Sequence, residues 1–396
     1  MMYLRISQRL GLLQELAGEL ARRREDLVTA AGEDTGAPSR IAGLEVDLAV
    51  EHLKTMAEEV PQVDGKSPYG TVAAIFPYDA APIMLARVGG AAVLGGNSFR
   101  FSFSSQTPRT ARLLDEIAAP FPLLKPVVAM DNRSFGGACV RDPEVRVLFI
   151  SGGGAVGETY AREALAFDKL FFAGPSGLPP AILFEDAPLK KAAAFVVRRA
   201  FINGGQYCTT LKRVYIHREI FPEARKLILA QMGEIRVGDP RDPGTWIGPI
   251  LVERTRLLLD RILAALDAPQ FLVPYHRDRE WRGPFLVETA QVPDLELFGP
   301  FLALCPAASD ADAAAKAMST RYPFSAAFFG TPPPGAKERL TETFGMVHDN
   351  PDFLFTPLRL PFGGKGESGW ILENKDGTLV KRDGAFIYSR ELVREE

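Results

Sequence analysis

Residues 71–103 read TVAAIFPYDAAPIMLARVGGAAVLGGNSFRFSF, and this stretch decides the fold class. A short apolar run, TVAAIF, is followed by an Ala-rich segment of helical composition and then by a second β-prone run, NSFRFSF. Apolar strands separated by helices are typical of βαβ units, in which helices cover both faces of a parallel sheet. The stretch therefore predicts an α/β fold.

The same alternation of β-prone and helical segments continues along the rest of the chain. Each further strand candidate is a short apolar run followed by a segment suited to a helix or to a Gly-rich loop. These runs are RVLFI (146–150), PPAILF (179–184), LKRVYIH (211–217), FLALCP (301–306) and SAAFFG (325–330).

The order of these segments predicts two doubly wound lobes. Residues 1–60 are charged and rich in Leu and Ala, so we expect helices before the first strand. We assign the first lobe to residues 1–176 and the second to residues 177–370. Residues 371–396 are expected to form a C-terminal tail that contains an oligomerisation strand.

Composition excludes several classes of function. The 396 residues contain 46 Lys and Arg against 49 Asp and Glu, a net charge of −3. This balance argues against nucleic acid or an anionic membrane as the main partner. Three cysteines do not resemble a disulfide framework, and Leu13, Leu16 and Leu20 follow helical spacing where a signal peptide would have an apolar core. We expect a soluble, cytoplasmic protein without a metal site.

A glycine-rich turn follows the strand at residues 146–150. Its residues Ser151, Gly152 and Gly153 precede an expected helix that contains Gly157. Free backbone N–H groups at a helix N-terminus favour a phosphate, although a simple tight strand–helix turn is somewhat favoured for this segment taken alone. The spacing differs from the G-x-G-x-x-G fingerprint, so this segment alone predicts little.

A cysteine lies in the glycine-rich segment NGGQYC, residues 203–208. Glycines allow a ligand to approach the backbone closely, and Cys208 in such a loop is a candidate nucleophile for a carbonyl carbon. The alternative is a buried, inert cysteine, which is the commoner fate of a lone thiol. Cys139 and Cys305 fit that alternative, because neither has a comparable setting in the sequence.

Five segments in this order resemble motifs of the aldehyde dehydrogenase superfamily. NGGQYC is similar to the nucleophile loop N-x-G-Q-x-C. The other four segments occur in the same order and register as in the family. They are residues 150–157 (F-T-G-S-x-x-V-G in the family), 238–249 (G-D-P-x-D-x-x-T-x-x-G-P), 296–300 (E-I-F-G-P) and 361–369 (P-F-G-G-x-K-x-S-G).

The resemblance implies a cofactor-binding lobe, a catalytic lobe and thioester chemistry. Cys208 would attack an aldehyde, hydride would pass to NAD or NADP, and water or another acceptor would resolve the thioester. Glu296 would hold the nicotinamide ribose, and Phe298 would pack beside the ring. The other cofactor contacts implied are Ser151, Gly152, Gly153 and Gly157.

Two departures from the family motifs concern the chemistry itself. Hydrolytic members carry E-L-G-G-K, whose Glu activates the deacylating water, and Gly174 occupies that position here. A positioned base contributes about 10²–10⁴-fold, so its absence predicts slow hydrolysis. The family's P-W-N motif is Pro77-Tyr78-Asp79 here. An ionised Asp79 would repel the developing oxyanion, whereas a protonated Asp79 could donate to it.

A third departure concerns the adenosine end of the cofactor. The family's K-P-S-E, whose Lys and Glu grip the ribose, is replaced by residues 102–105, so Ser102 and Ser105 stand at the gripping positions. Loss of the Glu would suit a 2′-phosphate, and Arg100 on the same strand face could supply the cation. An Arg100 that is merely solvated is equally consistent with the sequence.

These residues lead to three hypotheses about the function. The first is an oxidoreductase whose Cys208 thioester goes to, or comes from, a non-water acceptor such as coenzyme A. The second is a hydrolytic aldehyde dehydrogenase that uses another base, with Glu185 and Glu373 as candidates. The third is a weak or inactive relative that serves as a binding or assembly subunit. A homodimer is left open, since residues 385–392 resemble the family's C-terminal strand.

Overall fold

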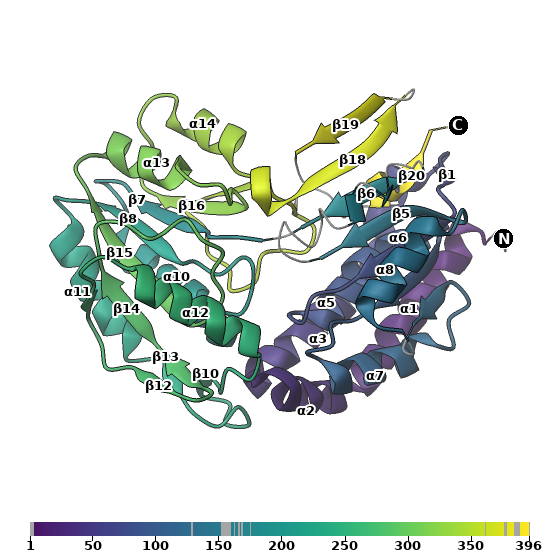
Figure 1. Ribbon diagram of the computed structural model, residues 1–396, viewed down its shortest axis with the longest axis horizontal. Helices are drawn as coiled ribbons and strands as arrows, with labels where there is room; N and C mark the ends of the chain where they lie inside the picture. The colour runs from purple at the N-terminus through teal and green to yellow at the C-terminus, as the bar shows by residue number, and fades with distance from the viewer. Residues whose placement is uncertain are drawn as a thin grey trace. The chain divides into compact units, whose positions relative to one another are not determined.

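The computed structural model describes residues 4–127, 130–151, 160–161, 163–164, 167, 169–174, 176–360, 362–375, 378–383 and 389–395. The chain divides into two compact units. The first comprises Met1–Asp34, Ala42–Gly174 and Gly369–Glu396, and the second comprises Thr35–Ile41 and Pro175–Ser368. Each unit is built on a seven-stranded sheet with helices packed against it (Figure 1), which confirms the predicted α/β fold.

The sheet of the first unit has the strand order β19-β18-β6-β5-β2-β3-β4. Its members β2 to β6 pair in parallel, whereas β18 and β19 are antiparallel additions at one edge. Their bounds are β2 (Thr71–Ile75), β3 (Ser98–Ser102), β4 (Leu124–Pro126), β5 (Val145–Ile150), β6 (Leu170–Ala173), β18 (Trp370–Lys375) and β19 (Thr378–Arg382).

Helices precede and connect these strands. Pro108 opens α7, where the missing N–H of proline costs nothing, and the Asp131 carboxylate caps α8 by accepting from the Arg133 and Ser134 N–H groups. The helices are α1 (Ile6–Arg22), α2 (Arg24–Thr35), α3 (Ser39–Lys54), η1 (Met56–Glu59), α4 (Val60–Val63), α5 (Ala81–Met84), η2 (Leu85–Gly89), α6 (Gly90–Leu94), α7 (Pro108–Ala118), α8 (Asn132–Arg141) and η5 (Ser389–Leu392).

The sheet of the second unit has the order β11-β14-β15-β8-β7-β16-β17, and only the β11–β14 pair is antiparallel. The strands are β7 (Pro180–Leu183), β8 (Arg213–His217), β11 (Gln270–Phe271), β14 (Phe285–Glu288), β15 (Phe301–Ala307), β16 (Ser325–Phe329) and β17 (Met346–Asp349). Short pairs also form: β9 (Arg236–Val237) with β10 (Thr245–Ile247), β12 (His276–Asp278) with β13 (Trp281–Gly283), and, in the first unit, β1 (Ser67–Pro68) with β20 (Val393–Arg394).

Both faces of this second sheet are buried, because alternate side chains along each strand join different cores. Val214 packs with α10 and α11 on one face, and its neighbour Tyr215 packs with α12, α13 and α14 on the other. This is the doubly wound arrangement. The helices are α10 (Leu189–Phe201), η3 (Ile202–Gly205), α11 (Phe221–Met232), α12 (Glu253–Ala265), α13 (Asp310–Met318), α14 (Ala336–Thr343) and η4 (Gly366–Ser368).

Several expectations at the C-terminal end differ from the structure or lie outside the described residues. Residues 371–382 extend the sheet of the first unit as β18 and β19, since Trp370 and Ile371 pair with β6. Of the expected strand at residues 385–392, positions 385–388 are outside the described residues and Ser389–Leu392 form a 3-10 helix. Most of the expected helix at residues 155–166 is also outside them.

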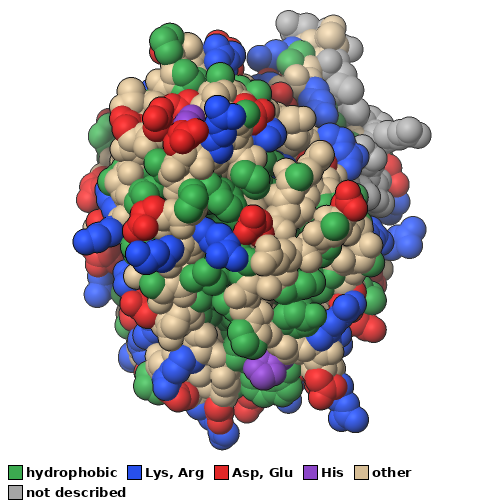
Figure 2. All heavy atoms as spheres, turned by 90° about the vertical axis from the view of Figure 1, so that its left-hand side faces the viewer, with side chains coloured by type: hydrophobic (Ala, Val, Ile, Leu, Met, Phe, Trp, Pro, Cys, Tyr) green, Lys and Arg blue, Asp and Glu red, His purple; other side chains and the backbone are tan. Residues whose placement is uncertain are grey.

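The surface and helix lengths add two observations. On the face shown in Figure 2, basic and acidic side chains are interspersed, and hydrophobic side chains gather toward its centre. None of the helices in the described part of the chain combines the length and apolar character required to cross a bilayer.

Candidate functional site

Three segments meet at the N-terminal edge of the second unit's sheet. Residues 176–178 precede β7, the nucleophile loop (residues 203–208) precedes β8, and the Glu296 loop (residues 294–300) precedes β15. Because β15, β8 and β7 are parallel neighbours, their preceding segments lie together. The structure thus assembles, within one unit, motifs that are up to about 120 residues apart in the sequence.

The nucleophile loop reverses direction through consecutive left-handed residues. Asn203, Gly204 and Gly205 have φ values of 51°, 58° and 70°, which explains why glycines occur here. The Thr210 hydroxyl then donates to the Tyr207 carbonyl at 2.7 Å and to the Gly205 carbonyl at 3.2 Å. These contacts fix the turn that presents Cys208.

The three cysteines differ in accessibility. Cys208 is partly exposed, whereas Cys139 and Cys305 are buried in the cores of the two units, as the sequence predicts. Burial raises the pKa of the Cys139 thiol to about 11 and that of Cys305 to about 12, so both are protonated near neutral pH. Cys208 is therefore the thiol that a substrate can reach.

A buried guanidinium lies beside the nucleophile loop. Arg199 of α10 donates to the Thr209 carbonyl at 2.7 Å and to the Leu354 carbonyl at 2.6 Å. Burial lowers the pKa of Arg199 to about 10, while negative charge on Cys208 or Tyr207 would raise it. Arg199 lies in a helix of ordinary composition, so the sequence gives no signal for this contact.

The Glu296 carboxylate is held at both oxygens. Ser176 Oγ donates to Oε1 at 2.8 Å, and the Arg254 guanidinium lies 3.3 Å from Oε2. The Glu296 side chain is 14% exposed, so it remains partly accessible to a ligand. Neither partner was predicted; Ser176 offered one signal, since the aligned family motif has glycine at its position.

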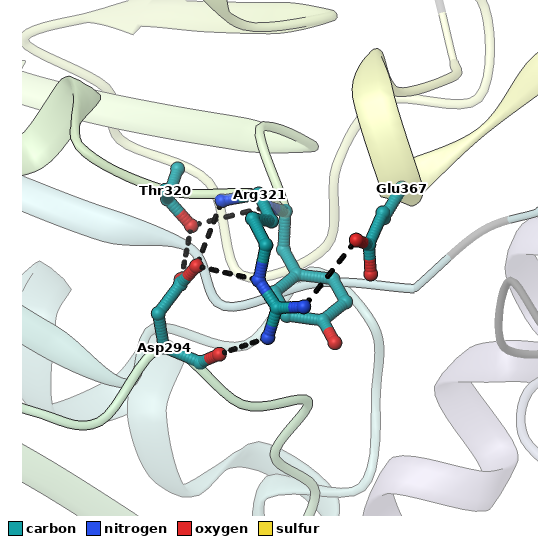
Figure 3. A network of polar contacts seen from close by, with 5 residues as sticks. Asp294, Thr320, Arg321 and Glu367 are labelled. Carbon is teal, nitrogen blue, oxygen red and sulfur yellow. Dashed lines mark hydrogen bonds and ion pairs between the residues drawn. The ribbon is translucent and has the colours of Figure 1, made fainter.

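Arg321 links the Glu296 loop to the motif at residues 361–369 (Figure 3). Its guanidinium donates to the Asp294 carbonyl at 2.8 Å and lies 3.4 Å from the Glu367 carboxylate. Asp294 also accepts from the Thr320 hydroxyl at 2.7 Å and from the Arg321 N–H at 2.9 Å. A single arginine therefore bridges three loops of the second unit.

The segment that aligns with the family's general-base motif lies beside Cys208. A Cβ on Gly177 would lie 2.6 Å from the Cys208 carbonyl oxygen, so the two backbones are in close contact. At the preceding end of the segment, Gly174 has a φ of 129°, a conformation that L side chains rarely adopt. The backbone conformation at residue 174, the position that aligns with the family's general base, therefore favours glycine.

The two alternative bases are engaged or placed elsewhere. Glu185 is exposed and follows β7, at the opposite edge of the sheet from Cys208, where its N–H donates to Asp310. Glu185 as a base for Cys208 is therefore wrong. Glu373, on β18 of the first unit, pairs with Lys375 and Arg382 at 3.2 Å each.

Candidate residues of the first unit gather at the carboxyl ends of its parallel strands. Asp79 follows β2, Ser102 ends β3 and Ser151 follows β5, and these strands are neighbours in the sheet. This edge is where open α/β sheets bind ligands. The Ser151 Oγ is buried without a hydrogen-bond partner among the described residues, as expected of a group that awaits a ligand. Gly152, Gly153 and Gly157 lie outside the described residues.

Of the residues predicted to contact the adenosine end of the cofactor, Ser102 and Arg100 contact other side chains of the first unit, and Ser105 is exposed. Ser102 Oγ and the Asn132 side-chain oxygen are 2.6 Å apart, and Ser105 is exposed. Arg100 is ion-paired with both Asp142 and Glu144, the latter at 3.0 Å. A 2′-phosphate would compete with two carboxylates for this guanidinium, and Arg100 is neither free nor simply solvated.

Comparisons with known proteins agree with this arrangement. The chain is 27% identical to a 2-aminomuconic 6-semialdehyde dehydrogenase of Pseudomonas sp, over 92% of this chain and 82% of that protein. It is 26% identical to a succinate-semialdehyde dehydrogenase of Escherichia coli strain K12, over 91% and 81%, whose name specifies NADP(+). An oxidoreductase structure from Marinobacter aquaeolei superposes with a TM-score of 0.88 at 21% identity, over 99% of this chain and 85% of that one.

The family model described as the aldehyde dehydrogenase family matches residues 1–379. The match includes the second unit's sheet, strands β2 to β6 and β18 of the first unit's sheet, the nucleophile loop and the Glu296 loop. The chain therefore belongs to the aldehyde dehydrogenase family.

Proposed function

We propose that this protein interconverts an aldehyde and an acyl thioester with NAD or NADP, through a covalent bond to Cys208. The observation that carries the proposal is the setting of Cys208: a partly exposed thiol in a fixed turn, beside the Arg199 guanidinium. The Cys208 thiolate adds to the aldehyde carbon, the aldehydic hydrogen departs as hydride, and an acyl group remains on the sulfur.

Residues of both units suit the nicotinamide cofactor. In the second unit, the partly exposed Glu296 carboxylate can accept from ribose hydroxyls, and Phe298 offers a partly buried ring. In the first unit, the buried Ser151 hydroxyl has no hydrogen-bond partner among the described residues. When bound, NAD or NADP accepts the hydride that leaves the substrate carbon. We also propose contributions from Ser105 and from the backbone of Gly152, Gly153 and Gly157 to this binding, with Ser102 and Arg100 further from it because of their own partners.

The acyl group should leave to a thiol in preference to water. Gly174 provides no carboxylate at the position of the family's base, and its backbone conformation excludes one. Without such a base, hydrolysis should be slower by about 10²–10⁴-fold. A thiol such as coenzyme A needs no such help once ionised: its sulfur bonds to the acyl carbon, and the Cys208 thiolate leaves.

The test is a single turnover with aldehyde and excess NAD or NADP, followed by absorbance of the reduced cofactor and by intact mass. We expect a burst, an acyl adduct on Cys208, and release of the adduct by coenzyme A. Cys208→Ser should abolish all three, while Cys139→Ser is the matched control because Cys139 is buried in the first unit. Sustained turnover without a thiol would show hydrolysis instead and refute the acylating function.

A second candidate is a binding or assembly subunit without turnover. This function is favoured because Ser102 is hydrogen-bonded to Asn132 and Arg100 is ion-paired with Asp142. Both side chains are therefore less available to bind the adenosine ribose. Absence of both a burst and cofactor binding by titration would select this function. For either function we propose a cytoplasmic location, since free thiols suit a reducing compartment. We also propose a homodimer, on the resemblance of residues 385–392 to the family's C-terminal strand.

A further inference from the structure

Lys212 is a buried lysine that the chemistry above does not use. It lies between Cys208 and β8, and its side chain has no exposed surface. Its backbone is fixed on both sides: the N–H donates to the Pro179 carbonyl at 3.0 Å, and its carbonyl accepts from the Ala303 N–H at 3.0 Å. The position of its side chain is therefore set by the sheet itself.

The Lys212 amine joins the two loops that carry the reacting groups. Nζ donates to the Gly205 carbonyl of the nucleophile loop at 2.8 Å and to the Gly299 carbonyl of the Glu296 loop at 2.7 Å. The Gly299 N–H also donates to the Gly205 carbonyl, at 2.9 Å. These loops touch so closely that a Cβ on Gly205 would clash with the Gly299 carbonyl.

The chemistry of this contact suits a donor of two hydrogen bonds better than an ion. Lys212 forms no ion pair with a carboxylate of the described residues, and burial lowers its pKa well below the usual range. A neutral amine has two N–H groups, which match the two carbonyls. A charged ammonium would leave a third N–H in the interior without a recorded partner.

We propose that Lys212 is a positioning residue that fixes the nucleophile loop against the Glu296 loop and so sets the distance between the Cys208 thiol and a group held at Glu296. The inference rests on the proposed function for its kinetic consequence. Its structural consequence, that the two loops are held as one body, is independent of turnover. Loss of the amine should let them separate by a fraction of an ångström, which reacting groups tolerate poorly.

The test compares Lys212→Met with a matched control, Lys169→Met. Lys169 is also buried and donates to two backbone carbonyls, of Asp142 and Val145, but it lies in the first unit far along the chain from either loop. Both variants replace a buried amine with a side chain of similar length, so both should lower Tm. Only Lys212→Met should change the loops.

We expect Lys212→Met to slow single-turnover reduction of the cofactor about tenfold and to change the cofactor Kd less than about threefold. Amide exchange at Gly299, whose N–H bonds to Gly205, should accelerate about tenfold. Lys169→Met should change neither quantity at a similar loss of Tm. Equal behaviour of the two variants would overturn the proposal.

Two further outcomes remain decisive. If Lys212→Met does not fold, Lys212→Gln, which keeps an amide donor on a shorter side chain, is measured in the same way. If the unsubstituted protein never reduces a cofactor, the proposed function fails, and Gly299 exchange in the variants still confirms or refutes the role of Lys212.

Discussion

Replacing Gly174 with glutamate would place, at the aligned position, the residue type that serves as the base in hydrolytic members of the family. The structure predicts that Gly174→Glu fails to restore hydrolysis. Gly174 is buried, its N–H donates to the Ile150 carbonyl at 3.1 Å, and its φ is 129°. A side chain forces this backbone to leave its conformation or to bear the strain, so the carboxylate is not delivered where a base is needed.

The cost of a side chain at this position follows from the backbone. A non-glycine residue in such a region costs about 1–3 kcal/mol. For a unit of this size, that loss lowers Tm by roughly 2–12 °C. Gly174→Ala should show most of the loss, because the strain comes from the Cβ and not from the carboxylate.

The assay measures steady reduction of NAD or NADP without any acceptor thiol, together with Tm. Gly18→Ala is the control: Gly18 is exposed on α1, nothing lies within 4 Å of an added Cβ, and helix propensity predicts a small gain in stability. The reasoning is refuted if Gly174→Glu sustains acceptor-free turnover and keeps the Tm of the unsubstituted protein.

Three further predictions follow from contacts described above. Ser176→Ala removes a hydrogen bond to the Glu296 carboxylate worth about 1.5 kcal/mol, so it should lower Tm by about 3–6 °C and, because the carboxylate is no longer held in place, raise the cofactor Kd about tenfold by titration; an unchanged Kd would contradict the role of Ser176. Asp79→Asn replaces a carboxylate with an amide donor, and should raise the burst rate at pH 8 about tenfold or more, whereas a slower burst would show that Asp79 acts in its protonated form. Burial raises the pKa of Asp115 to about 7, against about 4 for an unfolded chain, so its contribution to stability is complete below pH 4 and lost as pH rises through 7. Asp115→Asn should therefore gain about 1–3 kcal/mol relative to the unsubstituted protein between pH 4 and pH 8 in urea unfolding, and a difference independent of pH would refute this assignment.

The core elements were predictable because each carries its own local signal. The run DADAAAKAM coincides with α13, which Ser309 caps by accepting from the Asp312 N–H, and FLALCP coincides with most of β15. Both faces of β15 are buried, so its pattern is a continuous apolar run that sequence reading recognises. The C-terminal hairpin of β18 and β19 has polar and charged residues, and it becomes a sheet extension only through pairing with β6.

The candidate site was predictable in its motifs but not in the contacts that support them. Cys208 stands out because its loop is glycine-rich, and Glu296 stands out because it opens the motif E-L-F-G-P. Ser176, Arg254 and Lys212 act across long separations in sequence, and a single sequence contains no signal for which loop each one meets. Arg100 shows the same limit, because its carboxylate partners Asp142 and Glu144 come from the connection between α8 and β5.

The positive φ of Gly174 also affects whether a single substitution could supply a carboxylate at this position. Glycine and glutamate codons can differ by one nucleotide, so the lost carboxylate is only a single base change away in the gene. That change alone would be destabilising, because a residue with a side chain rarely adopts the φ of 129° that the backbone has at this position. If the proposed function holds, a substitution that supplies the carboxylate would also require the turn next to Gly174 to change its conformation.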